Sequence, residues 1–192
     1  MARSREFDTG KAVDAAIELF RRRGFEGVSI QEIVAATGVG RGSLYGAFGS
    51  KEGIYHAALE KYRAAYADPL CELLACDAPA RDLIRQVLTG LVDEIVGDRS
   101  QHACLVVSAA VEMAGRDAEV AGRLRSTTRQ LEDGFTALLS RAQREGEITL
   151  AGTPRDLARF IMMTIHGLRV LGAISPDRRS LMSTVEVVLA AL

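Results

Sequence analysis

Apolar residues recur every three or four positions along most of the chain, and segments with strand-like alternation are scarce. This spacing gives each of a series of helices one apolar stripe. It predicts an all-α fold of about nine helices. The last two helices, expected over 153–174 and 175–192, are apolar on more than one face, so they require a packing partner.

Residues 28–51 predict two short helices joined by a tight turn. Ser29 and Glu32 have the spacing of a capping box, in which each side chain satisfies a free backbone amide. Gly38 stands where the first helix must end with a positive φ. Two helices joined in this way form a helix-turn-helix, whose second helix, here expected over 40–48, can enter the major groove of DNA.

The outward side of the second helix carries residues suited to DNA. Arg41 can form two hydrogen bonds with guanine, and Gly42 lets the helix approach closely. The hydroxyls of Ser43 and Tyr45 can bond bases or phosphates. Lys51 adds a charge at the start of the next helix, where a phosphate fits. The other interpretation of this pattern is an ordinary helical hairpin with a polar outer face.

The segment AIELFRRRGFEGVSIQEIVAATGVGRGSLYGAFGSKEGIY resembles the DNA-binding region of TetR/AcrR-family transcriptional regulators. It matches the A-x-x-L-F motif, the two glycine-containing turns, the G-x-L-Y-x-x-F recognition helix and the S/G-K-E/D that follows. The match covers about residues 7–62. Gly40 stands where a serine is usual, and Gly46-Ala47 replaces a pair that often carries histidine or tyrosine. These departures affect the operator sequence more than DNA binding itself.

The resemblance implies which side chains contact DNA. Arg41, Gly42, Ser43 and Tyr45 would face the DNA, with Tyr45 and Lys51 directed mainly towards phosphates. Ser29 would contact a phosphate from the preceding helix. A small, mostly apolar molecule that enters the body of each subunit would release the DNA. Members of the family are most often ligand-responsive repressors that act as homodimers on palindromic operators.

The resemblance also implies the domain organisation. A three-helix DNA-binding head would occupy 1–49, and a fourth helix from about residue 50 would link it to an effector-binding and dimerisation domain, 50–192. Pro69 either kinks this linking helix or marks the start of a new one. Asp77 is expected to cap the fifth helix. The last two helices would form the dimer interface through Phe160, Ile161, Leu168, Leu181, Val185 and Val188.

Composition and charge bear on the class of partner and on the cellular compartment. The net charge is −1, with a slight basic excess before residue 64 and an acidic excess after it, which agrees weakly with a DNA-binding amino-terminal part. The three cysteines lack short paired spacing, which fits a reducing cytosol. No apolar stretch approaches the ~18 residues of a membrane span, and the amino terminus lacks a signal peptide. We therefore expect a cytoplasmic protein without a membrane partner.

Catalytic and cofactor chemistry is not indicated. His56, His102 and His166 are isolated in the sequence and form no Glu-x-x-His pair. The glycines at 38, 40 and 42 match neither a dinucleotide loop nor a P-loop. The sequence therefore predicts a protein that is not an enzyme and needs no cofactor or metal.

Helical faces indicate where a small molecule could bind. Cys104, Ser108 and Glu112 recur at intervals of four on a helix expected over 102–115, and this face either lines a cavity or meets water or an arginine. The full set of candidate residues is Tyr62, Tyr66, Cys104, Ser108, Glu112, Phe135, Met163 and His166. They fit a mostly apolar effector with one or two polar groups. The alternative is a helical DNA-binding or protein-interaction module with no small-molecule effector, which a filled core between residues 60 and 170 would favour.

Overall fold

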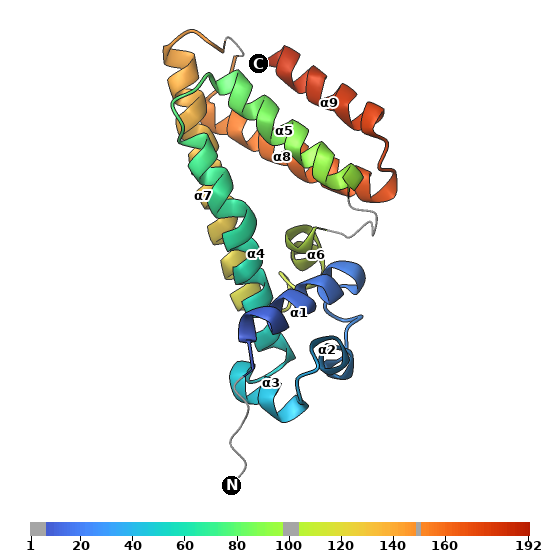
Figure 1. Ribbon diagram of the computed structural model, residues 1–192. Coiled ribbons are helices and arrows are strands. Elements are labelled where there is room, and N and C mark those ends of the chain that lie inside the picture. Colours follow the sequence, from blue (N-terminus) through green and yellow to red (C-terminus); the bar gives the residue numbers. More distant parts are fainter. Residues whose placement is uncertain (1–6, 98–103, 149–150) are drawn as a thin grey trace.

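The computed structural model describes residues 7–97, 104–148 and 151–192, and within these ranges the chain forms helices and no strand. Figure 1 shows short helices at the amino-terminal end of the molecule and longer helices at the other end, with α4 running between them. In chain order the helices are α1 (Thr9–Arg23), α2 (Ile30–Thr37), α3 (Arg41–Phe48), α4 (Lys51–Leu74), α5 (Ala80–Gly97), α6 (Leu105–Glu112), α7 (Ala118–Arg144), α8 (Pro154–Ile174) and α9 (Arg178–Ala191).

Local signals set the bounds of the first helices. Asp8 caps α1, and Gly24 follows its last residue with a φ of 69°. Ser29 and Glu32 form the predicted capping box at the start of α2, and Gly38 ends that helix in the left-handed conformation with a φ of 67°. The predicted helix-turn-helix is therefore confirmed, and α2 and α3 are its two helices.

Three aromatic side chains form the centre of the head, which we define as α1 to α3 with the first half of α4. The ring of Tyr55 lies edge-on to Phe20 and Phe25, at centroid distances of 4.8 and 5.0 Å. All three side chains are buried. Each such pair adds about 0.5–1.5 kcal/mol to the effect of burial. Because Tyr55 belongs to α4, this cluster fixes the linking helix firmly to α1.

α6 completes the core of the head, although it lies far along the chain. Leu105, Ala109 and Met113 belong to the same buried cluster as the side chains of α1 to α3. Only part of the helix expected over 102–115 can be compared, because residues 102 and 103 lie outside the described residues.

Because α6 packs in the core of the head, the expected division after residue 49 does not coincide with a break in side-chain packing.

α4 is one continuous helix, although Pro69 lies inside it. The sequence left open whether a new helix begins at Asp68-Pro69, and the structure excludes that alternative. α4 packs against α1 in the head and against α7 in the body. A movement of the body can therefore reach the head along one uninterrupted element.

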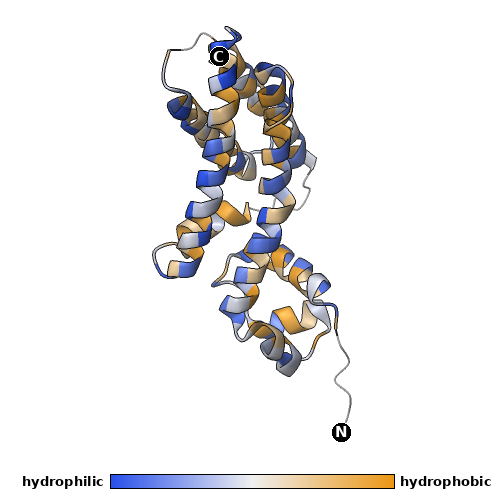
Figure 2. Cartoon of the chain, turned by 90° about the vertical axis from the view of Figure 1, so that its left-hand side faces the viewer, coloured by the Kyte–Doolittle hydropathy of each residue, from blue (hydrophilic) through white to orange (hydrophobic). Residues whose placement is uncertain are grey.

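The body consists of α5, α7, α8 and α9 with the second half of α4. Their apolar faces form a second core, in which Phe135, Leu139, Ile161 and Val185 have no exposed surface. Figure 2 shows apolar residues gathered where helices face one another and hydrophilic residues along the outer sides.

The amino terminus of α5 is capped by a residue from another part of the chain. The Glu147 carboxylate, just after α7, accepts hydrogen bonds from the amides of Ala80 at 2.9 Å and Arg81 at 2.8 Å. A carboxylate at this position satisfies free amides and complements the helix dipole. The prediction that Asp77 caps α5 is wrong, because its side chain is exposed and lies 3.7 Å from Arg141 instead.

α8 is long and apolar enough to cross a membrane by length and composition, contrary to the prediction from the sequence. A single such helix is weak evidence of a membrane span, since core helices pass the same test. Here Ile161 and Leu168 are buried in the body, whereas Met163 and Ile174 are exposed on the opposite side. The high apolar content of α8 therefore comes from two separate faces.

Candidate functional site

α3 presents its polar side to solvent at the end of the molecule. Leu44 is completely buried and anchors the helix in the head, while Arg41, Gly42 and Ser43 are exposed. A side-chain carbon added at Gly42 would meet no atom within 4 Å. The outer face of α3 is therefore free to approach a large partner closely, as entry into a DNA groove requires.

Arg41 is oriented by Tyr45, one turn further along α3. A terminal nitrogen of Arg41 donates a hydrogen bond to the Tyr45 hydroxyl at 3.3 Å, and the guanidinium carbon lies 5.1 Å from the ring centroid. A cation over an aromatic ring at an exposed site gains about 0.5–1 kcal/mol. This pair holds the guanidinium on the outer face, where both of its edges can reach hydrogen-bond acceptors.

Ser29 has an internal role at the start of α2. Its hydroxyl donates to the Glu32 carboxylate at 2.8 Å and accepts from the Glu32 amide at 3.3 Å. The Ser29 backbone amide and hydroxyl, together with the Arg23 guanidinium, lower the pKa of Glu32 from 4.5 to about 2. The side chain stays exposed beside α3, although its hydroxyl already has two partners.

Lys51 points back into the head. Its ammonium donates to the carbonyls of Phe25 and Val28, at 2.9 Å each, and lies 4.0 Å from the centroid of the Phe25 ring. An ammonium has three donors, so one remains for an outside acceptor such as a phosphate. Lys51 therefore holds the turn between α1 and α2, a role that its sequence context did not indicate.

Glu112 joins α6 to the end of α1. Its carboxylate accepts a hydrogen bond from the Phe25 amide at 2.7 Å. A side-chain carbon at Gly24 would lie 2.0 Å from the nearer carboxylate oxygen, so only glycine leaves room for this contact. Glu112 thus lies where α6 meets the end of α1, and its partner is a backbone amide and not the cavity, water or arginine that the sequence left open.

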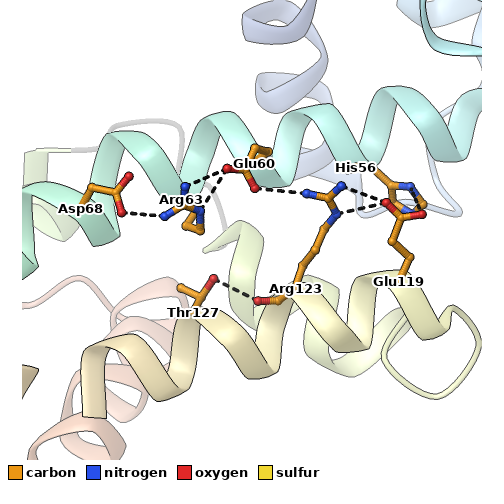
Figure 3. Close-up of polar contacts among 7 residues, drawn as sticks. All are labelled: His56, Glu60, Arg63, Asp68, Glu119, Arg123 and Thr127. Atoms are coloured by element: carbon orange, nitrogen blue, oxygen red, sulfur yellow. Dashed lines mark hydrogen bonds and ion pairs between the residues drawn. The ribbon is translucent and has the colours of Figure 1, made fainter. Parts of the chain in front are cut away.

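A row of ionisable side chains joins α4 to α7, and Figure 3 shows Arg123 of α7 lying between Glu60 of α4 and Glu119 of its own helix. His56 lies 2.9 Å from Asp117 and 3.2 Å from Glu119, and Arg123 lies 3.1 Å from Glu60. We call this row the α4–α7 ladder, and its members are His56, Glu60, Arg63, Asp68, Asp117, Glu119 and Arg123.

The body contains a cavity of about 420 Å³, partly open to solvent, between α4, α5, α7 and α8. Tyr62 and Tyr66 form part of its wall, with their ring centroids 4.3 Å apart. Arg63, at the end of the α4–α7 ladder, also lines the cavity. The volume falls in the range of sites for small molecules.

The cavity contains half of the candidate effector residues, namely Tyr62, Tyr66, Cys104 and His166. The other four lie elsewhere. Phe135 is buried in the core of the body, and Met163 is exposed on the outside of α8. Glu112 lies at the junction with Phe25, and Ser108, on the same helix, is not part of the cavity wall.

Sequence reasoning missed the charged pair at the cavity wall. Arg169 on α8 and Glu94 on α5 form two parallel hydrogen bonds of 3.2 Å each. Both residues line the cavity. The sequence did contain one signal for this pair: two opposite charges on the inner sides of otherwise apolar helices. A charge that faces inward requires a partner of opposite sign. The sequence could not show that these two helices lie side by side.

The outer side of α8 carries an exposed apolar stripe. Its members are Phe160, Met163, Val170, Leu171 and Ile174. On α9, Val187 is also exposed.

Of the residues expected at a dimer interface, only Phe160 belongs to this stripe. The other five are buried within the chain's own body and have almost no surface to offer a second copy: Ile161, Leu168, Leu181, Val185 and Val188. The exposed apolar surface of α8 therefore lies on the side opposite Ile161 and Leu168.

Comparison with family models gives matches over both parts of the chain. Residues 12–58 match the model described as bacterial regulatory proteins, tetR family. Residues 80–192 match the model described as BetI-type transcriptional repressor, C-terminal.

Curated relatives extend over nearly the whole length. The uncharacterized HTH-type transcriptional regulator YezE of Bacillus subtilis (strain 168) is 30% identical over 193 residues, which cover 100% of both chains. The HTH-type transcriptional repressor NemR of Escherichia coli (strain K12) is 29% identical over 181 residues, covering 91% of this chain and 89% of NemR.

Solved structures share the same arrangement. A cysteine mutant of the TetR family transcriptional regulator CifR, complexed with 26 bp double-strand operator DNA, superposes with a TM-score of 0.86 and 29% identity, over 98% of this chain and 99% of that one. The reduced form of Escherichia coli NemR gives a TM-score of 0.84 at 23% identity, over 94% of each chain, which is a likeness of fold.

Proposed function

Because the chain belongs to the TetR family of bacterial transcriptional regulators, and is therefore a DNA-binding regulator and not an enzyme, we propose that it is a ligand-responsive repressor. It would act in the cytoplasm as a homodimer on a palindromic operator. The observation that carries this proposal is the exposed outer face of α3, on which Tyr45 orients Arg41. The operator DNA bound to CifR supports it.

In this proposal, α3 is the recognition helix. Arg41 reads a base, most simply a guanine, through two hydrogen bonds, and Gly42 allows the close approach. Ser43 and Tyr45 contact bases or phosphates from the same face. Ser29 and Lys51 add phosphate contacts from either side of α3, with Lys51 using its remaining donor.

The exposed stripe on α8 supports a homodimer. Met163, Leu171 and Ile174 are 72%, 59% and 76% exposed, which places a contiguous apolar surface in water. Such surfaces usually mark an interface. A two-fold dimer buries the same stripe of each chain against the other, with Val187 of α9 beside it. It also presents two copies of α3 to two half-sites of a palindrome.

The cavity supports control by a small, mostly apolar effector. Because of this cavity, the core between residues 60 and 170 is not completely filled. A filled core would have favoured the alternative of a body without an effector. Arg63 lies both at the cavity wall and in the α4–α7 ladder. A ligand that shifts α4 against α7 would therefore change the position of the head. To release DNA, this ligand needs to bind the DNA-free arrangement of the protein more tightly than the DNA-bound one, by about 1–3 kcal/mol for a typical coupling.

Selection of bound sequences from a random duplex pool tests the proposal. The purified protein should enrich a palindrome whose half-sites are separated by about one helical turn or a multiple of it. Enrichment of a single half-site would contradict the dimer. No enrichment, together with uniform loss of binding as the salt concentration rises, would contradict a sequence-specific repressor.

A further inference from the structure

The charges at the cavity wall are already neutralised by protein partners. Arg169 binds Glu94 through two parallel hydrogen bonds, and the side chains of both are largely buried. Arg63 lies 2.8 Å from Glu60 and 2.6 Å from Asp68. A charged ligand would thus enter without a free opposite charge, and its desolvation would be uncompensated.

One polar atom at the cavity wall lacks a partner. Nδ1 of His166 is buried and makes no hydrogen bond within the part of the chain that the structure describes. Burial lowers the pKa of His166, and the neighbouring Arg169 lowers it further, so both favour the neutral imidazole. A neutral ring nitrogen can donate or accept, depending on the tautomer. Nδ1 can therefore bind either a hydroxyl or a carbonyl group.

Most of the remaining wall is apolar. Leu70, Leu73, Val87, Leu91 and Ile165 line the cavity together with the two tyrosine rings. The Tyr62 hydroxyl already donates to the sulfur of Cys104 at 3.8 Å. Gln86 and Thr128 are exposed at the rim, where water can satisfy them. The wall thus offers apolar contact over most of its area, and one of the residues that line it, His166, carries a buried nitrogen without a hydrogen-bond partner.

We propose that the effector is an uncharged, predominantly apolar molecule with one hydroxyl or carbonyl group, which hydrogen-bonds to Nδ1 of His166. This inference rests on the proposed function, because it names the chemical class of the effector for the same cavity. An uncharged molecule loses little on leaving water, and its polar group satisfies an atom that is otherwise buried without a partner.

Three probes of similar shape separate the polar group from the apolar contact: naphthol, methylnaphthalene and naphthoate. Their affinities for the full-length protein are measured by titration calorimetry at pH 7, where the first two are neutral and the third is an anion. Naphthol should bind about fivefold more tightly than methylnaphthalene, the effect of one net hydrogen bond. Naphthoate should bind the most weakly of the three.

Two variants assign the preference to His166. His166→Phe should retain binding of methylnaphthalene and remove the preference for naphthol. His166→Asn places an amide near the position of Nδ1 and should keep that preference. The circular dichroism spectrum and operator binding of each variant show whether it is folded.

The outcomes distinguish this inference from the proposed function. Tightest binding of naphthoate, equal binding of naphthol and methylnaphthalene, or a preference that survives in His166→Phe would overturn the effector class alone. If none of the three binds, the cavity is not an effector site and the ligand-responsive part of the proposed function fails as well. Palindrome selection without ligand still tests the DNA-binding part.

Discussion

The carboxylate of Glu112 accepts a hydrogen bond from the backbone amide of Phe25 at 2.7 Å, across 87 positions of the chain. This contact ties α6 to the turn that leads into the helix-turn-helix. It requires glycine at position 24, where φ is 69° and an added side-chain carbon would lie 2.0 Å from a Glu112 oxygen. The attachment of α6 to the rest of the head therefore depends on two residues that fit each other.

A double-mutant cycle tests this fit. Glu112→Ala should lower the free energy of unfolding by about 2 kcal/mol, because a hydrogen bond to a charged acceptor is lost. Gly24→Ala should cost more in the wild-type chain than in the Glu112→Ala background, where the clash is gone and only the strain of the positive φ remains. Chemical denaturation measures all four proteins.

The adjacent Val111 provides a matched control for the cycle. Its side chain is 82% exposed on the same helix, so Val111→Ala should leave stability nearly unchanged. Additive effects of the two junction substitutions would show that Gly24 and Glu112 do not interact.

Arg41 and Tyr45 should have different effects on DNA recognition. Arg41→Ala should cost about 1–3 kcal/mol of discrimination at one base of each half-site, because a base-reading guanidinium is removed. Tyr45→Phe keeps the ring beside Arg41 and removes the hydroxyl that accepts from its guanidinium, so discrimination at the same base should fall, but by less than in Arg41→Ala. Titration against operator variants at a fixed salt concentration measures both effects, and wild-type behaviour in both variants would contradict the assignment of α3.

Lys51→Ala is a poor test of phosphate binding. Its ammonium bonds two carbonyls of the turn between α1 and α2, so the substitution lowers stability as well as DNA affinity. The melting temperature of this variant has to be measured before its DNA affinity is interpreted.

The capping box of α2 should weaken in acid. The pKa of Glu32 is lowered from 4.5 to about 2 in the folded chain, so the ionised form is the stabilising one. Its contribution is fully present above pH 4.5 and is lost as the pH falls towards 2. Glu32→Gln cannot titrate. The difference in melting temperature between wild type and this variant should therefore shrink between pH 5 and pH 2, and a constant difference would contradict the ionised cap.

A charge in the exposed stripe of α8 should prevent dimer formation. Met163→Glu places a carboxylate at the position where two copies would bury an apolar surface, so the variant should sediment as a monomer and lose high affinity for a palindrome. Val111→Glu, at a position on α6 that is also largely exposed, should remain dimeric. Dimeric Met163→Glu would move the interface away from this stripe.

The α4–α7 ladder should carry the signal from the cavity to the head. Arg123 binds Glu119 on its own helix and Glu60 on α4. Arg123→Leu should leave effector affinity in the absence of DNA within about twofold and reduce the factor by which effector weakens DNA binding. Competition titrations with naphthol and operator measure this factor. An unchanged factor would exclude the ladder from the coupling.

The features that the sequence predicted depend on neighbours a few residues apart. The capping box of Ser29 and Glu32, the end of α2 at Gly38 and the outward face of α3 all follow from local spacing. Contacts between distant segments were not predictable in this way. Lys51 bonds carbonyls 23 and 26 positions away, and Glu147 caps a helix that begins 67 positions earlier.

A second limit on prediction from the sequence was the choice between two apolar faces of one helix. α8 is apolar on both sides, and periodicity identifies the faces without saying which one the chain covers by itself. The sequence assigned Ile161 and Leu168 to a partner, whereas they belong to the buried core that the chain forms with its own α5, α7 and α9. Periodicity also could not show which effector candidates face the cavity. Tyr62 and His166 line it, whereas Phe135 is buried in the core and Met163 is exposed on the outside.

The position of α6 also bears on how such regulators can be recombined. An exchange of residues 1–49 between two regulators would cut through a shared core, because Leu105 and Ala109 pack among the side chains of the transplanted helices. The new head would meet the old α6, and Gly24 would meet whichever residue stands opposite it. DNA specificity and the segment around Glu112 are therefore inherited together, and a functional chimaera has to carry both.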